Sequence, residues 1–100
     1  GLELETQAEV DKLALCLLAR WPAARHDFPR LVDRLLCQWS PLPDQTPPER
    51  ERYAAANRIA LAFIRRLGRL VDAGQLAGLR RVLRRFWSAD MPGKLALAGA

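Results

Sequence analysis

The chain has 100 residues, half of them apolar and 27% charged, a composition typical of one folded soluble domain. A domain of this length can bury a single core, but it is too small to enclose a large active site between two lobes. Sixteen basic and eleven acidic residues give a formal net charge of +5, which favours acidic proteins, nucleic acids or anionic surfaces as partners.

The apolar residues predict an all-α fold. Leu and Ala occur 18 and 16 times, whereas Val, Ile and Thr together occur eight times. Leu and Ala favour helices, while β-branched residues favour strands. The elements described below predict a four- or five-helix bundle built from two antiparallel helical hairpins.

The first helix is predicted over residues 7–20. Thr6 and Glu9 have the spacing of a capping box, and the helix should end before Trp21 because Pro22 follows. Residues 1–5 are then expected to be a disordered tail or a remnant of cloning. Apolar residues cover most of this helix, which predicts a central position or a partner that covers it.

A second helix is predicted over residues 27–39, with Asp27 as its N-cap and Pro29 in the first turn. A proline-rich connector, residues 40–46, should be stiff and extended. It separates the two predicted hairpins.

The third helix, residues 47–73, has the clearest start of all. Thr46 and Glu49 form a second capping box around two prolines, and Gly74 stands where a glycine ends a helix. A fourth helix follows over residues 75–88, with Phe86 and Trp87 on its apolar side and four arginines on the other. Residues 90–100 predict a fifth helix that is cut short, or a flexible tail.

The sequence predicts no enzyme, no cofactor and no metal site. Its only histidine, His26, lies in a predicted loop, and no nucleophile sits in a tight glycine turn. Cys16 and Cys37 lie in helical patterns, where two buried free thiols are expected, although a disulfide between them stays open. Neither a signal peptide nor a membrane span is indicated, which favours an intracellular protein, cytoplasmic or nuclear.

The charge is concentrated in residues 65–85, which contain seven arginines and one acid, Asp72. Three explanations stay open: a solvated helix face, a phosphate-binding face for nucleic acid, and a face for an acidic protein or an anionic membrane surface. A helix-turn-helix is disfavoured because the turn at residues 75–79 offers one base-reading side chain. The candidate basic face consists of Arg58, Arg65, Arg69, Arg80, Arg81, Arg84 and Arg85.

The function predicted is a non-catalytic helical protein–protein interaction module, either a domain of a larger protein or a small adaptor or regulatory protein. The alternative is a basic nucleic-acid-binding domain that uses the arginine face. The expected partner is an acidic or helical protein, with nucleic acid second and a homo-oligomer left open. The candidate apolar interface consists of Leu15, Leu18, Trp21 and Trp39, because exposed tryptophan is enriched at binding hot spots.

Overall fold

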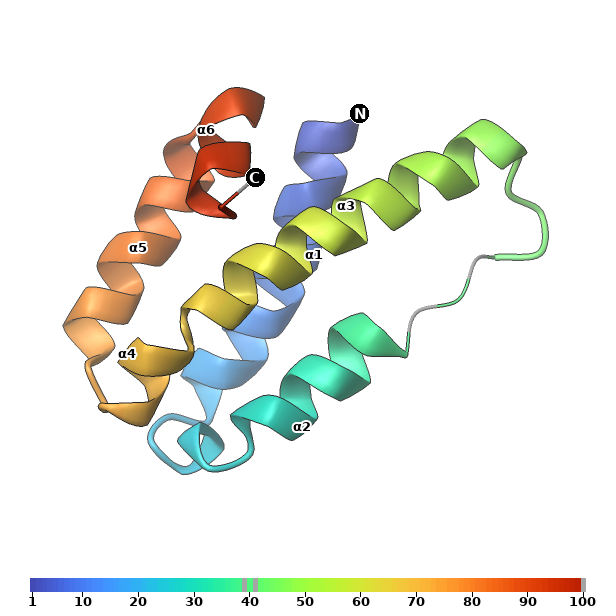
Figure 1. Ribbon diagram of the computed structural model, residues 1–100. Coiled ribbons are helices and arrows are strands. Elements are labelled where there is room, and N and C mark those ends of the chain that lie inside the picture. The colour runs from blue at the N-terminus through green and yellow to red at the C-terminus, as the bar shows by residue number, and fades with distance from the viewer. Residues whose placement is uncertain (39, 41, 100) are drawn as a thin grey trace.

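The computed structural model describes residues 1–38, 40 and 42–99, and it confirms the all-α class (Figure 1). The described part of the chain contains six α-helices and no strand. These are α1 Leu2–Ala19, α2 Phe28–Val32, α3 Pro47–Arg66, α4 Gly68–Asp72, α5 Leu76–Ser88 and α6 Met91–Leu97. A 3₁₀ turn, Ala23–Arg25, follows α1, and a π-helical turn, η2, Asp33–Cys37, continues α2.

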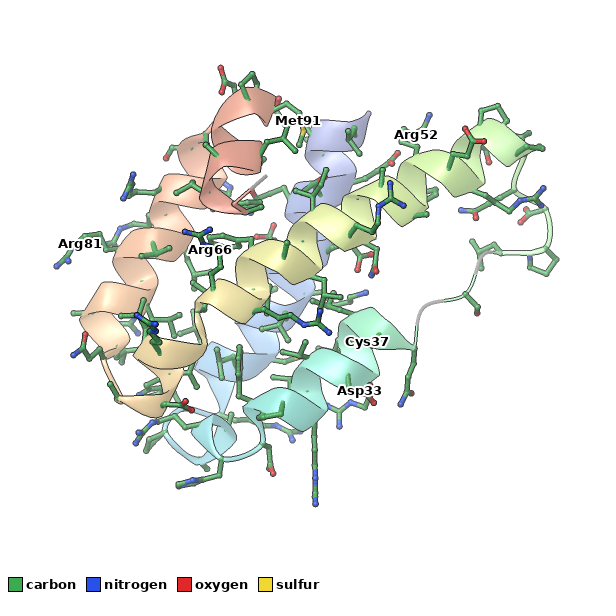
Figure 2. All side chains as sticks on the ribbon, in the orientation of Figure 1. Asp33, Cys37, Arg52, Arg66, Arg81 and Met91 are labelled. Atoms are coloured by element: carbon green, nitrogen blue, oxygen red, sulfur yellow. The ribbon has the colours of Figure 1, made fainter. Side chains whose placement is uncertain are left out.

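Helix α1 begins one turn earlier than predicted. Thr6 is fully buried inside it, and its hydroxyl donates to the carbonyl oxygen of Leu2, 2.7 Å away, so Thr6 is not an N-cap. The expected tail at residues 1–5 is wrong for residues 2–5, which are helical. The earlier start is supported by a tertiary contact, because the carboxylate of Glu5 pairs with Arg52 of α3 at 2.7 Å; Arg52 is labelled in Figure 2. This contact raises the pKa of the Arg52 guanidinium above its ordinary value.

The predicted second helix consists of α2 and η2, and its expected last residue, Trp39, lies outside the described residues. Asp27 precedes α2 without a side-chain cap, so the predicted N-cap is wrong in that detail. At the other end, Asn57 of α3 donates its side-chain amide to the carbonyl oxygen of Leu36, 2.8 Å away. A tertiary contact therefore stabilises the end of η2.

The capping box before α3 is confirmed. The amide of Glu49 donates to the hydroxyl of Thr46 at 3.3 Å, and the Glu49 carboxylate accepts from the amide of Thr46 at 3.4 Å. The single long helix predicted over 47–73 is wrong, because the chain bends at Leu67 and α4 begins at Gly68. Leu67 is almost fully buried, and glycine is a poor helix former, so packing at this position overrides helix continuation.

The core is centred on α1 and α3, which make the most extensive contact between helices although they belong to different predicted hairpins. Phe63 of α3 stacks on Phe86 of α5, with ring centroids 4.1 Å apart, and this pair joins α5 to the core. The largest fully buried apolar side chains are Val10, Leu13, Leu17, Leu36, Phe63, Ile64, Leu67, Val71, Leu79 and Phe86.

Two basic side chains, Lys94 and Arg25, cap the C-terminal ends of α5 and α4. Lys94 of α6 is 1% exposed, and its ammonium group donates to the carbonyl oxygens of Phe86 and Ala89 at the end of α5, 2.7 and 2.5 Å away. Arg25 donates in the same way to the carbonyl oxygens of Val71 and Asp72 at the end of α4. Positive charge is favourable at a helix C-terminus, so both contacts stabilise the fold.

The turn between α4 and α5 requires its glycine, as the sequence predicts. Gly74 has a φ of 67°, which lies in the left-handed region. A Cβ atom at this position would also lie 3.0 Å from the guanidinium carbon of Arg25. Within the predicted 90–100 segment, residues 91–97 form the short helix α6. Lys94 attaches this helix to the end of α5.

Candidate interaction surfaces

An open groove of about 390 Å³ runs between α1 and α5, and we call it the α1–α5 groove. Both helices turn their main apolar side elsewhere, α1 towards α3 and α5 towards the core through Leu79 and Phe86. The groove is left between the edges of these two apolar sides. Its lining residues are Gln7, Val10, Asp11, Ala14, Leu15 and Leu18 of α1 with Leu83, Arg84 and Trp87 of α5.

Large apolar side chains are exposed on both walls of this groove. Leu15 is 69% exposed on the α1 wall, and Trp87 is 68% exposed on the α5 wall. Leu4, 75% exposed, lies on the same stripe of α1 as Leu15 because the two are three helical turns apart. The exposed stripe of α1 consists of Leu4, Ala8, Asp11, Lys12, Leu15 and Ala19, and four of these six are apolar. A helix side that only faces water is normally polar.

The helical pattern places Trp87 and Phe86 on the same apolar side of α5, but only Phe86 packs in the core. Phe86 is fully buried, whereas Trp87 points out of the core into the groove. The helical period places Trp87 at the edge of the apolar arc of α5, about 100° from Phe86. The sequence carried this signal, but only the packing of α1 shows that the edge becomes the wall of a groove.

The predicted apolar interface is only partly brought together. Leu15 and Leu18 both line the α1–α5 groove. Trp21 lies outside it and is half-buried beside Arg25, whose guanidinium carbon is 5.9 Å from the indole centroid. Trp39 lies outside the described residues, so the structure does not place it.

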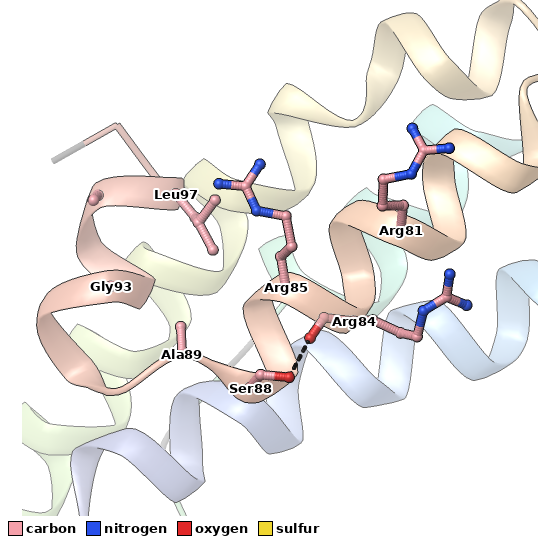
Figure 3. A pocket seen from close by; sticks show the side chains of 8 residues that line it. Arg81, Arg84, Arg85, Ser88, Ala89, Gly93 and Leu97 are labelled. Carbon is pink, nitrogen blue, oxygen red and sulfur yellow. Dashed lines mark hydrogen bonds between the residues drawn. The ribbon is translucent and has the colours of Figure 1, made fainter.

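A second depression, the α5–α6 cleft, is strongly basic (Figure 3). It is lined by Arg81, Arg84, Arg85, Ser88, Ala89, Gly93, Ala96 and Leu97. The sequence of α5 contains no acid. Among the described residues, the ion pairs are Lys12 with Glu9 and Arg52 with Glu5, so no carboxylate neutralises the arginines of the cleft. Arg84 lines both the cleft and the α1–α5 groove.

The other predicted arginines do not join this cleft. Arg65 lines a separate depression with Asp33 and Asp72 between α2, η2 and α3–α4. Arg58, Arg69 and Arg80 are exposed on α3, α4 and α5. Arg66, the one arginine of residues 65–85 outside the candidate basic face, lies against Gly99 beside the end of α6 (Figure 2). Nothing local in the sequence indicates that contact, because it depends on how α6 folds back.

The two thiols are free and differ in exposure. Cys16 is half-buried beside Arg20, Arg30 and Arg34, whereas Cys37 is exposed, so the expectation of two buried thiols is wrong for Cys37. Among residues 1–38, 40 and 42–99, no three His, Cys, Asp or Glu side chains are grouped as metal ligands. In the same residues, every helix is too short or too polar to cross a bilayer.

Comparison of the chain with protein-family models, with curated proteins and with solved structures finds no match. The functional interpretation therefore rests on the geometry of the α1–α5 groove and the α5–α6 cleft.

Proposed function

We propose that the protein is a non-catalytic helical protein–protein interaction module that docks a helical partner in the α1–α5 groove. The observation that carries this proposal is the exposure of Leu15 and Trp87 on opposite walls of one groove. It acts either as a domain of a longer protein or as a small adaptor. The free thiols Cys16 and Cys37 fit a reducing, intracellular compartment.

A partner that docks in the groove would remove apolar surface of its walls from water. Tryptophan and leucine side chains that enter an interface contribute about 25 cal/mol for each Å² buried. Covering roughly 100 Å² of the exposed Trp87 side chain would therefore contribute on the order of 2–3 kcal/mol. Amphipathic helices bind in apolar grooves between helices, and tryptophan is enriched among the residues that contribute most to binding.

In this proposal the helices form the predicted four- or five-helix bundle, if α2 with η2 and α3 with α4 each count as one helix and α6 is the short fifth, and the bundle serves as a rigid support. Phe63 and Phe86 hold α5 in place by stacking. Lys94 donates hydrogen bonds to the carbonyl oxygens of Phe86 and Ala89 at the C-terminal end of the same helix, next to Trp87. Fixed walls reduce the ordering cost of binding, because few side chains have to be immobilised.

The experiment is selection from a displayed library of helical peptides with randomised surface positions, using the purified chain as bait. Selected peptides are then measured against Leu15→Glu and Trp87→Ala by calorimetry. Leu42→Glu is the matched control, because Leu42 is 62% exposed but does not line the groove. We expect binding to weaken at least about tenfold, or 1.4 kcal/mol, with Leu15→Glu and Trp87→Ala, and to persist with Leu42→Glu. If the selected peptides bind the wild type, Leu15→Glu, Trp87→Ala and Leu42→Glu with equal affinity, the groove is refuted as the docking surface.

Nucleic-acid binding is the second candidate, and the unneutralised arginines of the α5–α6 cleft favour it. Labelled single- and double-stranded DNA and RNA would be titrated by fluorescence anisotropy at low and near-physiological salt. Binding through this cleft should be lost in Arg81→Glu/Arg85→Glu. For the wild type, the logarithm of the binding constant should fall linearly with the logarithm of the salt concentration. Arg30→Glu/Arg34→Glu is the control, since it changes two exposed arginines at the same spacing on α2 and η2. Equal losses in both variants would indicate a bulk charge effect and no site.

A further inference from the structure

The two walls of the α1–α5 groove differ in charge. The α1 wall carries an acid, Asp11, and no basic residue, whereas the α5 wall carries Arg84 and no acid. Both side chains are exposed, and between them lie the apolar residues Leu15, Leu18, Leu83 and Trp87. A partner that fits this groove needs an apolar centre, a basic group over the α1 wall and an acidic group over the α5 wall.

We infer that this partner is a second copy of the chain, an inference that rests on the proposed function of the groove. A copy turned by 180° about an axis along the groove places its α1 over α5 and its α5 over α1. The wall with Asp11 then meets the partner's wall with Arg84, and this happens twice in the dimer. The apolar residues of each α1 wall meet those of the partner's α5 wall in the same arrangement.

Charge selects this arrangement over the other two-fold packing. If the axis ran across the groove, each α1 would lie on the partner's α1 and each α5 on the partner's α5. That packing would set the Asp11 walls against each other and the arginine-bearing α5 helices against each other, and juxtaposed like charges disfavour association. Only the axis along the groove pairs Asp11 with Arg84, and Lys12, the cation of the neighbouring exposed stripe, does not line the groove and is paired with Glu9 of its own helix.

The exposed stripe of α1 suits close contact with another helix. Ala8 and Ala19 are both exposed and stand on either side of Asp11 and Leu15 along this stripe. Small side chains let helix axes approach to the short end of the usual 8–10 Å range. The α5–α6 cleft adjoins the groove at Arg84, but Arg81 and Arg85 line the cleft alone, so this dimer leaves them accessible to a further anionic partner.

The test is sedimentation equilibrium of the purified chain from low micromolar to submillimolar concentration, with charge reversals in the groove. The wild type should reach a monomer–dimer equilibrium. Asp11→Arg and Arg84→Asp should each raise the dimer Kd by about tenfold or more, because each creates two like-charge contacts. An equimolar mixture of the two variants should form a heterodimer, and the double variant should dimerise as the wild type does.

Two charge reversals outside the groove serve as matched controls. Asp44→Arg and Arg58→Asp change the same charges at exposed positions outside the groove and should leave the dimer Kd unchanged. A wild type that is monomeric throughout overturns the inference, and so does a dimer insensitive to both groove reversals or one with no heterodimer in the mixture. A monomer whose groove still binds the selected peptides would remove the dimer alone, while peptides that bind Leu15→Glu and Trp87→Ala as tightly as the wild type would remove the proposed function.

Discussion

Leu15 of α1 and Trp87 of α5 face each other across one open groove, and each is exposed over more than two thirds of its surface. Neither residue is needed to close the core, because α1 reaches α3 through other residues and α5 is anchored by Phe86. Their exposed side chains therefore contribute little to the stability of the fold. They are the basis of the docking surface proposed above.

Trp87→Ala should leave the stability of the fold nearly unchanged. The side chain is mostly in water, and substitutions at such positions usually change the free energy of unfolding by no more than about 0.5 kcal/mol. Urea denaturation followed by circular dichroism measures this directly. A loss above about 2 kcal/mol would show that Trp87 belongs to the core and would remove it as a docking anchor.

Lys94→Met should destabilise the protein although it places an apolar side chain in a buried site. The substitution leaves the carbonyl oxygens of Phe86 and Ala89 without their buried donor, at a cost of about 2 kcal/mol. For a domain of this size the melting temperature should fall by roughly 10 °C. Lys12→Met, at an exposed position, is the control, and an unchanged melting temperature in both variants would contradict the capping role.

Arg25→Gln should loosen the turn between α4 and α5. The variant loses hydrogen bonds to the carbonyl oxygens of Val71 and Asp72, and bonds from charged donors contribute about 1.5–3 kcal/mol. Amide hydrogen exchange should accelerate first in residues 68–79. Arg30→Gln changes an exposed arginine close in sequence and should show the wild-type exchange pattern.

The two predicted capping boxes, Thr46 with Glu49 and Thr6 with Glu9, should respond differently to substitution. Thr46→Ala removes a side-chain cap that the structure confirms, at a cost of about 1 kcal/mol in unfolding free energy. Glu9→Gln should cost almost nothing, because Glu9 caps no helix and pairs only with the exposed Lys12. Chemical denaturation of the two variants checks this, and equal losses would restore the capping box at Thr6.

Features with local causes could be predicted from the sequence. Thr46 with Glu49 indicated the start of α3, and Gly74 indicated the end of α4, because capping and left-handed turns depend on neighbouring residues. The outward position of the arginines of α5 followed from the helical period. The all-α class followed from Leu and Ala.

Features that depend on tertiary contacts could not be predicted. Thr6 resembles an N-cap, yet the pairing of Glu5 with Arg52 supports a helix that begins earlier. The bend at Leu67 combines the burial of this residue with the low helix propensity of Gly68, and a single glycine in a helical pattern does not by itself predict a break. The groove itself needs two helices whose relative position the sequence pattern does not give, so the sequence predicts Leu15 as an interface residue but only places Trp87 on the apolar side of its helix.

The most direct measurement is amide chemical-shift mapping of the ¹⁵N-labelled chain during titration with a selected helical peptide. The account predicts perturbations concentrated on the groove walls, residues 7–18 of α1 and residues 83–87 of α5, with the Trp87 indole signal among them. Perturbations confined to the depression around Arg65, or to the α5–α6 cleft without α1, would contradict the α1–α5 groove as the docking surface.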